Sequence, residues 1–465
     1  MVRRLLHDSQ LSRALIAETA TAVSRRGFLT AAGGLSLAGL LSACSSPIVA
    51  GFTGGQPNTA DVLFWHLFSG GDGANMKLMV DATQKSDHMT VESTLLSWGN
   101  PYYTKLALSA SSGRPPDVAI SHLSRLPLLA QAGLLEPIEN TGLTKAGVTK
   151  DRFTPAAWAK ATVDGTVFAV PLDTHPFVMY YNVPLAAKAG LLDAAGKLKP
   201  MKGRDDFVNA LKAMKGAGAR YGAVASNTTD PSTAWRWFMT LYSALAGPIV
   251  ADLGTRITID NAAMEETFAF MQSLTGELAL MPGNAAPATV STLFGQGNAG
   301  FLFDGEWQIS AYRGVTLPDG TPLDFTVVPF PAILGEKAVA YADSHSLIIP
   351  KSSGRSAERA AHSVEFITGL LDNSLIWAGG GHIPAWFPVQ RSKEFLALKP
   401  QSNYVQAAFD AVYDPIAWYT GAGSDFQNAM GAVIANVLGG AATPKQGVED
   451  MTSSLRTFST ARPPV

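Results

Sequence analysis

Residues 61–80, DVLFWHLFSGGDGANMKLMV, decide the class of fold. A short apolar run that favours a β-strand ends at His66, a glycine-rich loop follows, and apolar residues then recur at helical spacing up to Val80. A strand, a glycine loop and a helix in succession are the first unit of an α/β domain with a parallel sheet. Ligands of such sheets bind beyond the carboxyl ends of the strands, so Trp65 and His66 are expected at a binding edge. The loop has neither of the glycine spacings of phosphate-binding loops.

The alternation of strands and helices continues along the chain. Hydrophobic periodicity and cap residues predict the following elements. Strands are expected at 91–96, 118–120 and 221–224, and helices at 104–112, 123–132, 202–214, from about Trp235, at 261–274 and at 356–371.

Residues 24–44, SRRGFLTAAGGLSLAGLLSAC, predict an export signal that ends in a lipid-attachment site. Paired arginines precede an uncharged run, and small residues precede Cys44, the only cysteine of the chain. This order is typical of a twin-arginine signal and a bacterial lipobox. A buried helix with a core cysteine, or a short membrane span, are the alternatives. We therefore expect a signal peptide at 1–44, lipidated at Cys44, and a flexible tether at 45–60.

The composition of the chain limits which partners it can bind and which chemistry it can perform. Residues 1–44 contribute +3 to a full-length charge of −2, which leaves about −5 for the rest and argues against a nucleic-acid partner. If Cys44 carries lipid, no thiol remains for a disulfide, a cysteine-ligated metal or a catalytic cysteine. The length of 465 residues suits two or more domains.

Five blocks of sequence, taken in order, resemble a known family. They are LFWH at 63–66, KLALSASSGRPPDV at 105–118, PLDTHPFVMYYN at 171–182, GFLFDGEW at 300–307 and GGHIPA at 380–385. The set resembles the family 1 extracellular solute-binding proteins of ABC importers, which include maltose-type and sn-glycerol-3-phosphate-type receptors. The resemblance extends over nearly all of the chain after Cys44.

The resemblance implies a periplasmic-binding-protein type II fold, in which two α/β lobes are joined by a hinge and the ligand lies between them. The first crossing between lobes is expected near 171–182 and the second within 327–341. The implied N-terminal lobe is 61–172 with 338–385, and the C-terminal lobe is 178–330 with 388–465.

The implied function is that of a substrate-binding lipoprotein, not an enzyme, that captures a mono- or oligosaccharide for import. Its partners would be the carbohydrate, the ABC permease subunits in the membrane, and the membrane itself through the lipid anchor. The implied location is extracytoplasmic, and no cofactor is expected.

Tryptophans are the first candidates for sugar contacts, because sugars present apolar faces to aromatic rings in concave sites. Seven lie at predicted element ends: Trp65, Trp98, Trp235, Trp237, Trp307, Trp386 and Trp418. We expect Trp65, Trp235, Trp237 and Trp307 to contact ligand, with core packing as the alternative. Trp307 is favoured because it lies in the block where family members commonly place a stacking aromatic.

The resemblance also implies a polar set for the cleft. Its members are Tyr103, His122, Asp173, His175, Ser344, His345 and His382, to which His66 is added from the first strand. A metal site is the alternative for the histidines. No HxH or HExxH spacing is present, so no metal is expected. The histidines could also be hydrogen-bonded loop residues without a ligand.

Other functions remain open at this point. A secreted glycan hydrolase needs two carboxylates at defined spacing, and Asp173, Asp304, Glu306 and Asp343 are the candidates. A glycerophosphate receptor needs arginine donors, for which Arg114, Arg125, Arg236 and Arg313 could serve. A structural lipoprotein without ligand is the third alternative. The aromatic and histidine-rich set favours a neutral or weakly polar carbohydrate.

Overall fold

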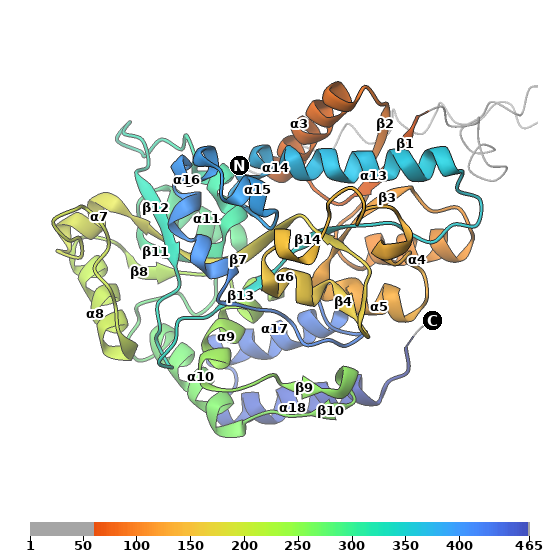
Figure 1. Cartoon of the computed structure of the whole chain (residues 1–465). Helices are drawn as coiled ribbons and strands as arrows, with labels where there is room; N and C mark the ends of the chain where they lie inside the picture. Colours follow the sequence, from red (N-terminus) through yellow and green to blue (C-terminus); the bar gives the residue numbers. More distant parts are fainter. Residues whose placement is uncertain (1–59, 464–465) are drawn as a thin grey trace, which may run out of the picture. The chain divides into compact units, whose positions relative to one another are not determined.

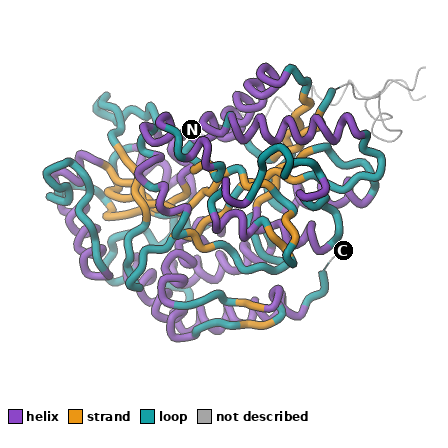
Figure 2. The backbone as a smooth tube through the Cα atoms, in the orientation of Figure 1, coloured by secondary structure: helices purple, strands orange, loops and turns teal. Residues whose placement is uncertain are grey.

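Two β-sheets with helices around them make up residues 60–463, the part of the chain that the computed structural model describes (Figures 1 and 2). The predicted signal at 1–44, its Cys44 and the tether up to residue 59 lie outside the described residues. No helix among residues 60–463 combines the length and apolar character needed to cross a membrane.

The first sheet confirms the strands that open the sequence. Its order is β2-β1-β3-β14-β6, with β1 parallel to β2 and β3, and β14 antiparallel to β3. Val62 and Phe64 of β1 are fully buried and point into the core of this lobe. The strand bounds are β1 Val62–His66, β2 Val91–Leu95, β3 Val118–His122, β6 Val170–Pro171 and β14 His345–Ile348.

Helices cover this sheet. Helix α3 packs against α13 and α14 through buried methionines such as Met76 and Met79. Helix α4 begins at Asn100, earlier than predicted, because Pro101 occupies its first turn, where proline needs no hydrogen bond. The bounds are α3 Gly70–Asp87, α4 Asn100–Ser111, α5 Leu126–Gln131, α6 Pro155–Lys160, α13 Ala357–Asp372 and α14 Ser374–Ala378.

The second sheet is built around β7, Asp173–Asn182, whose ten residues are all buried. Its order is β16-β13-β7-β11-β8, and β12 and β15 also pair with β7. The other bounds are β8 Tyr221–Val224, β11 Ala299–Gly305, β12 Phe325–Pro329, β13 Ala340–Asp343, β15 Ile383–Pro384 and β16 Ala411–Val412. Because β7 pairs with four strands, it is the element on which the second lobe is assembled.

Helices α9, α10, α17 and α18 form a layer beside this sheet, with α17 packed on α9 and α18 packed on α10 and α17 (Figure 1). The bounds are α8 Gly203–Gly216, α9 Pro231–Leu245, α10 Asn261–Thr275, α11 Pro287–Gly295, α17 Asp425–Leu438 and α18 Pro444–Thr460. The short elements are β4 Thr162–Val163, β5 Thr166–Val167, α7 Val183–Lys188, β9 Val250–Ala251, β10 Arg256–Ile257, α12 Ile309–Tyr312, α15 Phe387–Gln390 and α16 Lys393–Ala397.

The chain passes between the two sheets at Leu172 and at Ser344. The second passage is later than the predicted 327–341, because Asp343 still pairs with His175 on β7. A third segment, β15, pairs with Asp173 and Thr174. Three segments that are distant in sequence therefore meet at the start of β7, between the two sheets.

Candidate functional site

A cavity of about 310 Å³ lies where the two sheets meet. Its lining residues come from the loop after β1, the ends of β3 and β11, the crossing strands β7 and β14, and the start of α9. Its lining residues are Leu67, Phe68, Ser69, Asp72, Trp98, His122, His175, Asp230, Ser232, Arg236, Trp307 and His345. Strands β1 and β3 are parallel and both end here, which is the usual place for a ligand in an α/β sheet.

Three histidines form one wall of this cavity. The ring centroids of His175 and His345 are 4.2 Å apart, those of His122 and His345 4.7 Å, and those of His122 and His175 5.6 Å. Burial lowers the pKa of His175 to about 3 and that of His122 well below its ordinary value, and the neighbouring imidazole of His345 adds to both shifts. His122 and His175 are therefore neutral at physiological pH.

The buried carboxylate of Asp173 orients two of these rings. It accepts hydrogen bonds from the Nδ1 atoms of His345 and His175 at 2.7 and 3.1 Å, and also from the backbone N–H of His345. The indole N–H of Trp377 donates to the same carboxylate at 2.6 Å. Because a carboxylate can only accept, both Nδ1 atoms carry the proton in these bonds, and the neutral ring of His175 is left with a bare acceptor at Nε2.

His382 is close to the same carboxylate but differs in charge. Its Nε2 lies 3.1 Å from Asp72, and its Nδ1 lies 3.2 Å from Asp173 and 3.0 Å from Glu306. Burial opposes its charged form, but these carboxylates outweigh burial and raise the pKa of His382 well above its ordinary value. His382 is thus an imidazolium that links the loop after β1 to the crossing strands.

Trp307 and Arg236 line the same cavity, with the Trp307 ring centroid 5.9 Å from that of His175. The guanidinium of Arg236 lies 4.6 Å from the centre of the Trp307 ring, a cation–π distance. Asp230, the N-cap of α9, accepts from the backbone N–H of Ser232, which fixes the first turn of the helix that carries Arg236. An indole ring and a guanidinium therefore line the cavity beside the imidazoles.

The structure brings most of the predicted polar residues together. His122, His175, His345 and Trp307 line the cavity. Tyr103, Asp173 and His382 lie directly behind them; the Tyr103 hydroxyl is 2.8 Å from His122 Nδ1. Ser344 is fully buried between the crossing strands and does not line the cavity.

Four other predicted ligand contacts do not line this cavity. Trp235 and Trp237 are fully buried in the core of the second lobe, and the Trp235 indole N–H donates to Asp414. They lie within an amphipathic helix, where large apolar side chains pack in the core instead of contacting a ligand. His66 packs its ring between Phe64 and Phe68 and accepts from the backbone N–H of Phe68.

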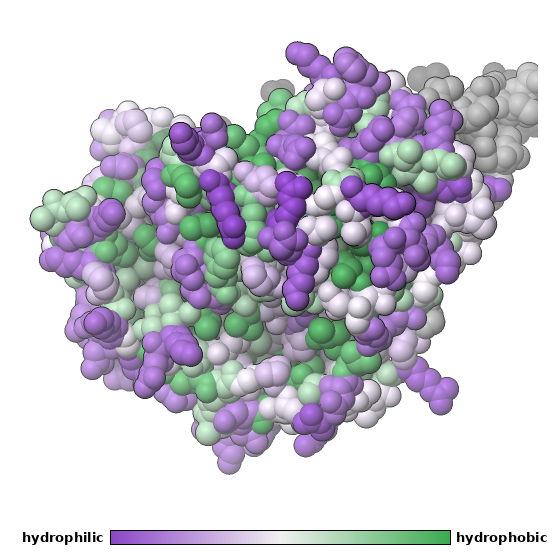
Figure 3. All heavy atoms as spheres, in the orientation of Figure 1, coloured by the Kyte–Doolittle hydropathy of each residue, from purple (hydrophilic) through white to green (hydrophobic). Residues whose placement is uncertain are grey.

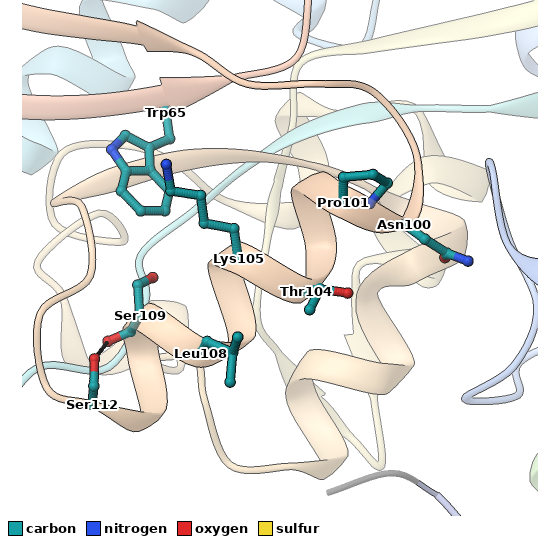
Figure 4. A pocket seen from close by; sticks show the side chains of 8 residues that line it. All are labelled: Trp65, Asn100, Pro101, Thr104, Lys105, Leu108, Ser109 and Ser112. Carbon is teal, nitrogen blue, oxygen red and sulfur yellow. Dashed lines mark hydrogen bonds between the residues drawn. The ribbon is translucent and has the colours of Figure 1, made fainter. Parts of the chain in front are cut away.

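Trp65 is the fourth, and it lies in a separate groove of about 790 Å³ along α4 (Figure 4). Figure 4 shows Lys105 beside the Trp65 ring, with Leu108 and Thr104 on the same helix, and the lysine nitrogen is 5.4 Å from the ring centre. Residue alternation explains the placement, because Trp65 and the core residue Phe64 point to opposite faces of β1. The groove has few converging polar groups, so we regard the histidine-lined cavity as the functional site.

Five lining residues were given no site role by the sequence: Leu67, Phe68, Asp72, Asp230 and Ser232. Arg236 was considered only as a donor for a glycerophosphate, and Trp98 only as one of the tryptophans at element ends. Asp72 follows the glycine loop after β1, where a site edge was expected. The sequence identified Asp230 and Ser232 as a helix cap. A cap predicts where a helix begins, but it does not predict which part of the protein the helix packs against. A single sequence holds no sign that α9 points its first turn at the crossing strands.

The carboxylates considered for a hydrolase do not line the cavity. Asp173, Glu306 and Asp343 are fully buried and Asp304 is almost so, each behind the lining residues. Burial raises the pKa of Glu306 to about 7 and that of Asp343 to about 6. Their position fits structural groups of the crossing region.

Asp304 predicts a pH dependence of stability. Burial, helped by the charge of Asp230, raises its pKa to about 7, above the value of about 3.9 in an unfolded chain. Between these pH values the folded protein holds a proton that the unfolded chain has released. The free energy of unfolding should therefore fall by about 3–4 kcal/mol as pH rises from about 4 to 7. Urea unfolding of Asp304→Asn across this range should lack that component; the same slope in the variant would contradict the assignment.

Solved structures share this fold. The sugar-binding protein MalE from the phytopathogen Xanthomonas citri matches with TM-score 0.70 and 17% identity, over 86% of this chain and 97% of that one. An ABC transporter solute-binding protein from Thermotoga lettingae, bound with α-D-tagatose, matches with TM-score 0.69 and 20% identity, over 86% and 99%. The cyclic α-maltosyl-1,6-maltose binding protein from Arthrobacter globiformis matches with TM-score 0.68 and 19% identity, over 86% and 98%.

These likenesses establish the two-lobed, periplasmic-binding-protein type II fold that the sequence predicted. No curated protein sequence matches the chain. The profile of the bacterial extracellular solute-binding proteins matches residues 78–395, which is well over half of the sequence. The chain belongs to the bacterial extracellular solute-binding protein family.

Proposed function

We propose that this protein is the substrate-binding subunit of an ABC importer and captures a carbohydrate, a mono- or oligosaccharide, in the histidine-lined cavity. The observation that carries the proposal is that an indole ring, Trp307, and the imidazoles of His175 and His345 line one cavity. Sugars bind such sites by laying an apolar face on the ring and donating hydroxyl hydrogens to fixed acceptors. Structures of similar fold include proteins that bind tagatose and a cyclic maltosyl-maltose.

Binding without turnover is supported by the position of the four carboxylates considered for a hydrolase, which lie behind the lining residues. Hydrolysis of a glycosidic bond needs a proton-donating carboxylic acid and a second carboxylate beside the bond. Asp173 is held ionised by His345 and His175, which lower its pKa against the opposing effect of burial, and it lies behind the imidazoles. We propose a non-enzymatic receptor whose lobes close by bending at Leu172 and Ser344, a hinge motion.

A glycerophosphate or glycerophosphodiester ligand is the second candidate, and one residue favours it. Arg236 is buried, lines the cavity, and forms no ion pair within 4.0 Å with a carboxylate of residues 60–463. Its hydrogen bond to the Ser232 hydroxyl, at 3.3 Å, leaves donors for an anion. The neutral imidazoles of His122 and His175 in the same cavity favour hydroxyls, so we rank a carbohydrate first.

A thermal-shift screen tests the proposal directly. Maltose, maltotriose, tagatose and related sugars form one arm, and glycerol 3-phosphate with glycerophosphocholine forms the other. A ligand at 100 times its Kd should stabilise the fold by about 2.7 kcal/mol, which is read as a rise in Tm. Chromatography of each sugar after incubation tests for product. A sugar that raises Tm and stays intact supports the receptor, whereas turnover of that sugar would favour the hydrolase.

We also propose the domain bounds and the anchor that the sequence indicates. The proposed lobes are 61–172 with 338–385 and 178–330 with 388–465, except that residues 340–343 go with the second lobe because β13 pairs with β7. The proposed signal peptide is 1–44 and the proposed tether is 45–60. Cys44 would carry the lipid and hold the receptor at the outer side of the cell membrane, beside its permease.

Cys44→Ala is expected to release the protein from the membrane. Lipid labelling and membrane fractionation of producing cells measure this, with Ser45→Ala as the matched control. Export should persist if Arg25 and Arg26 are intact and should fail in the Arg25→Lys, Arg26→Lys double variant. Membrane retention of Cys44→Ala would remove the lipid anchor from the proposal.

A further inference from the structure

Residues 421–425, at the start of α17 in the second lobe, lie against the first lobe beside the cavity. Every residue from Gly421 to Ser424 is buried. The indole of Trp98, which lines the cavity, packs on Gly423, where a Cβ would lie 3.0 and 3.1 Å from two atoms of the ring. The two lobes therefore touch at the cavity in a place where the chain does not cross between them.

Two hydrogen bonds join the lobes at this contact. The backbone N–H of Ala422 donates to the Ser124 hydroxyl at 3.0 Å, and the Asn100 amide donates to the Asp425 carboxylate at 2.9 Å. Arg125 donates to the amide oxygen of Asn100 at 3.1 Å, which directs the NH₂ group of that amide toward the second lobe. Polar groups of the two lobes are thus matched, donor to acceptor.

Glycine lets the two backbones approach each other. A Cβ at Gly421 would lie 2.5 Å from the carbonyl oxygen of Ser124, and one at Gly423 would lie 2.8 Å from the Cα of Gly99. Gly421 has a φ of +107° and Gly423 a φ of +65°, values that favour glycine. Because the obstructing atoms belong to the backbone, a side chain at Gly421 would hold the lobes apart.

The contact is polar and lies outside the apolar cores. Neither residues 421–425 nor Trp98 and Asn100 belong to the core of either lobe. Domains whose interface is not large and apolar are expected to move relative to each other. The contact can therefore form when the lobes close on the cavity and break when they open.

We propose that residues 421–425 form a latch that engages Trp98, Asn100 and Ser124 when the lobes close, and that the latch raises the affinity for the bound molecule without touching it. None of residues 421–425 lines the cavity, and neither do Asn100 and Ser124. The inference rests on the proposed capture of a ligand by lobe closure. Contacts that exist only in the closed form stabilise the bound state and slow release.

A double-mutant cycle on Asn100→Ala and Asp425→Ala tests the latch, with Kd and the release rate measured for maltotriose and for tagatose. Each single variant should weaken binding about 3–10-fold, mainly through faster release, and the double variant should lose little more. Urea unfolding of the ligand-free protein should show no coupling between the two residues, because the open form lacks their bond. Coupling in unfolding with an unchanged Kd would mean a permanent contact and would overturn the proposal.

Gly421→Ala tests the backbone side of the latch, and Gly218→Ala is its matched control. Gly218 is also in the second lobe and has a similar φ of +117°, but a Cβ there would meet only the end of the Lys188 side chain, at 3.6 Å. Gly421→Ala should weaken binding of the same sugars about 10-fold or more, since the clash is with backbone. Equal affinities in the two variants would contradict the latch.

A crosslink tests the latch without any sugar. Asn100→Cys and Asp425→Cys, in a chain with Cys44→Ser so that no other thiol is present, place thiols at the two ends of a cross-lobe hydrogen bond. A short bis-thiosulfonate reagent should join them and lower the radius of gyration measured by small-angle X-ray scattering. Near-UV circular dichroism checks that the variant is folded.

The crosslink also separates the latch from the identity of the ligand. Maltotriose or tagatose should speed the reaction if the cavity takes a carbohydrate. A crosslink that no sugar accelerates would support the latch and contradict carbohydrate capture. Failure of the folded variant to crosslink, with or without sugar, would overturn the latch.

Discussion

Asp173→Asn should lower the free energy of unfolding by about 3–5 kcal/mol, the cost of breaking a buried, hydrogen-bonded charge pair. The carboxylate accepts from the two imidazole Nδ1 atoms, the Trp377 indole and the backbone of His345. An asparagine has one acceptor oxygen, so its NH₂ group would face N–H donors and leave them without partners. Urea unfolding followed by tryptophan fluorescence measures the loss.

Asp372→Asn is the matched control, because Asp372 also accepts from an indole N–H, that of Trp386, but is exposed to solvent. Its effect should stay within about 0.5–1 kcal/mol. The Asp173 contribution should be constant between pH 5 and 8. Its folded pKa lies well below the ordinary value, so its stabilisation is present above about pH 4 and is lost only in acid. Equal losses in the two variants would show that Asp173 does not hold the crossing strands together.

Local pattern was enough to predict the elements that build the lobes. Strands β1 and β8 and helix α10 lie within one residue of their predicted bounds, because each has a periodic apolar pattern and a clear cap or turn. Helix α3 differs: it begins at Gly70, inside the predicted glycine loop, and continues to Asp87, beyond the predicted Val80. Capping side chains explain the starts of α9 and α10, where Asp230 and Asp260 accept from backbone N–H groups. Such signals are local, so one sequence contains them.

Placement of side chains at the site depended on which face of an element was buried. Trp235 and Trp237 were expected at the ligand, yet they face the core, whereas Arg236 between them reaches the cavity. Consecutive residues of a helix point in directions about 100° apart, and the sequence does not state which direction faces the partner lobe. The histidines of the cavity lie where strands meet: His122 ends β3, His345 begins β14 and His175 is near the start of β7.

The distribution of residues on the surface does not point to the site. On the face shown in Figure 3, hydrophilic and hydrophobic residues are interspersed over both groups of helices. The chemistry that distinguishes this protein is internal, at the start of β7, where Asp173, His175 and the two returning segments meet. The proposed hinge residues Leu172 and Ser344 are thus close in sequence to the cavity residues His175 and His345, which would couple closure of the lobes to what the cavity holds.

Trp307→Ala should weaken binding of the sugar found by thermal shift at least about 30-fold, the loss of about 2 kcal/mol expected for a buried aromatic contact. The ring lines the cavity, lies beside His175 at 5.9 Å, and carries the guanidinium of Arg236 on its face. Because Trp307 is only half-buried, the variant should keep the unfolding free energy to within about 1 kcal/mol. Isothermal titration gives the affinity, and retained affinity would remove Trp307 from the ligand contacts.

Gly305→Ala reaches the same ring without touching the cavity. A Cβ at Gly305 would lie 1.9 Å from the Trp307 indole, so the ring must leave its position. Gly295→Ala is the matched control, since a Cβ there meets its nearest atoms at 3.9 and 4.0 Å, an ordinary contact distance. Gly305→Ala should weaken sugar binding nearly as much as Trp307→Ala, and the double variant should lose little more, because both remove one interaction. If the losses of binding free energy in the two single variants were fully additive in the double variant, Gly305→Ala would not be acting through the position of the Trp307 ring.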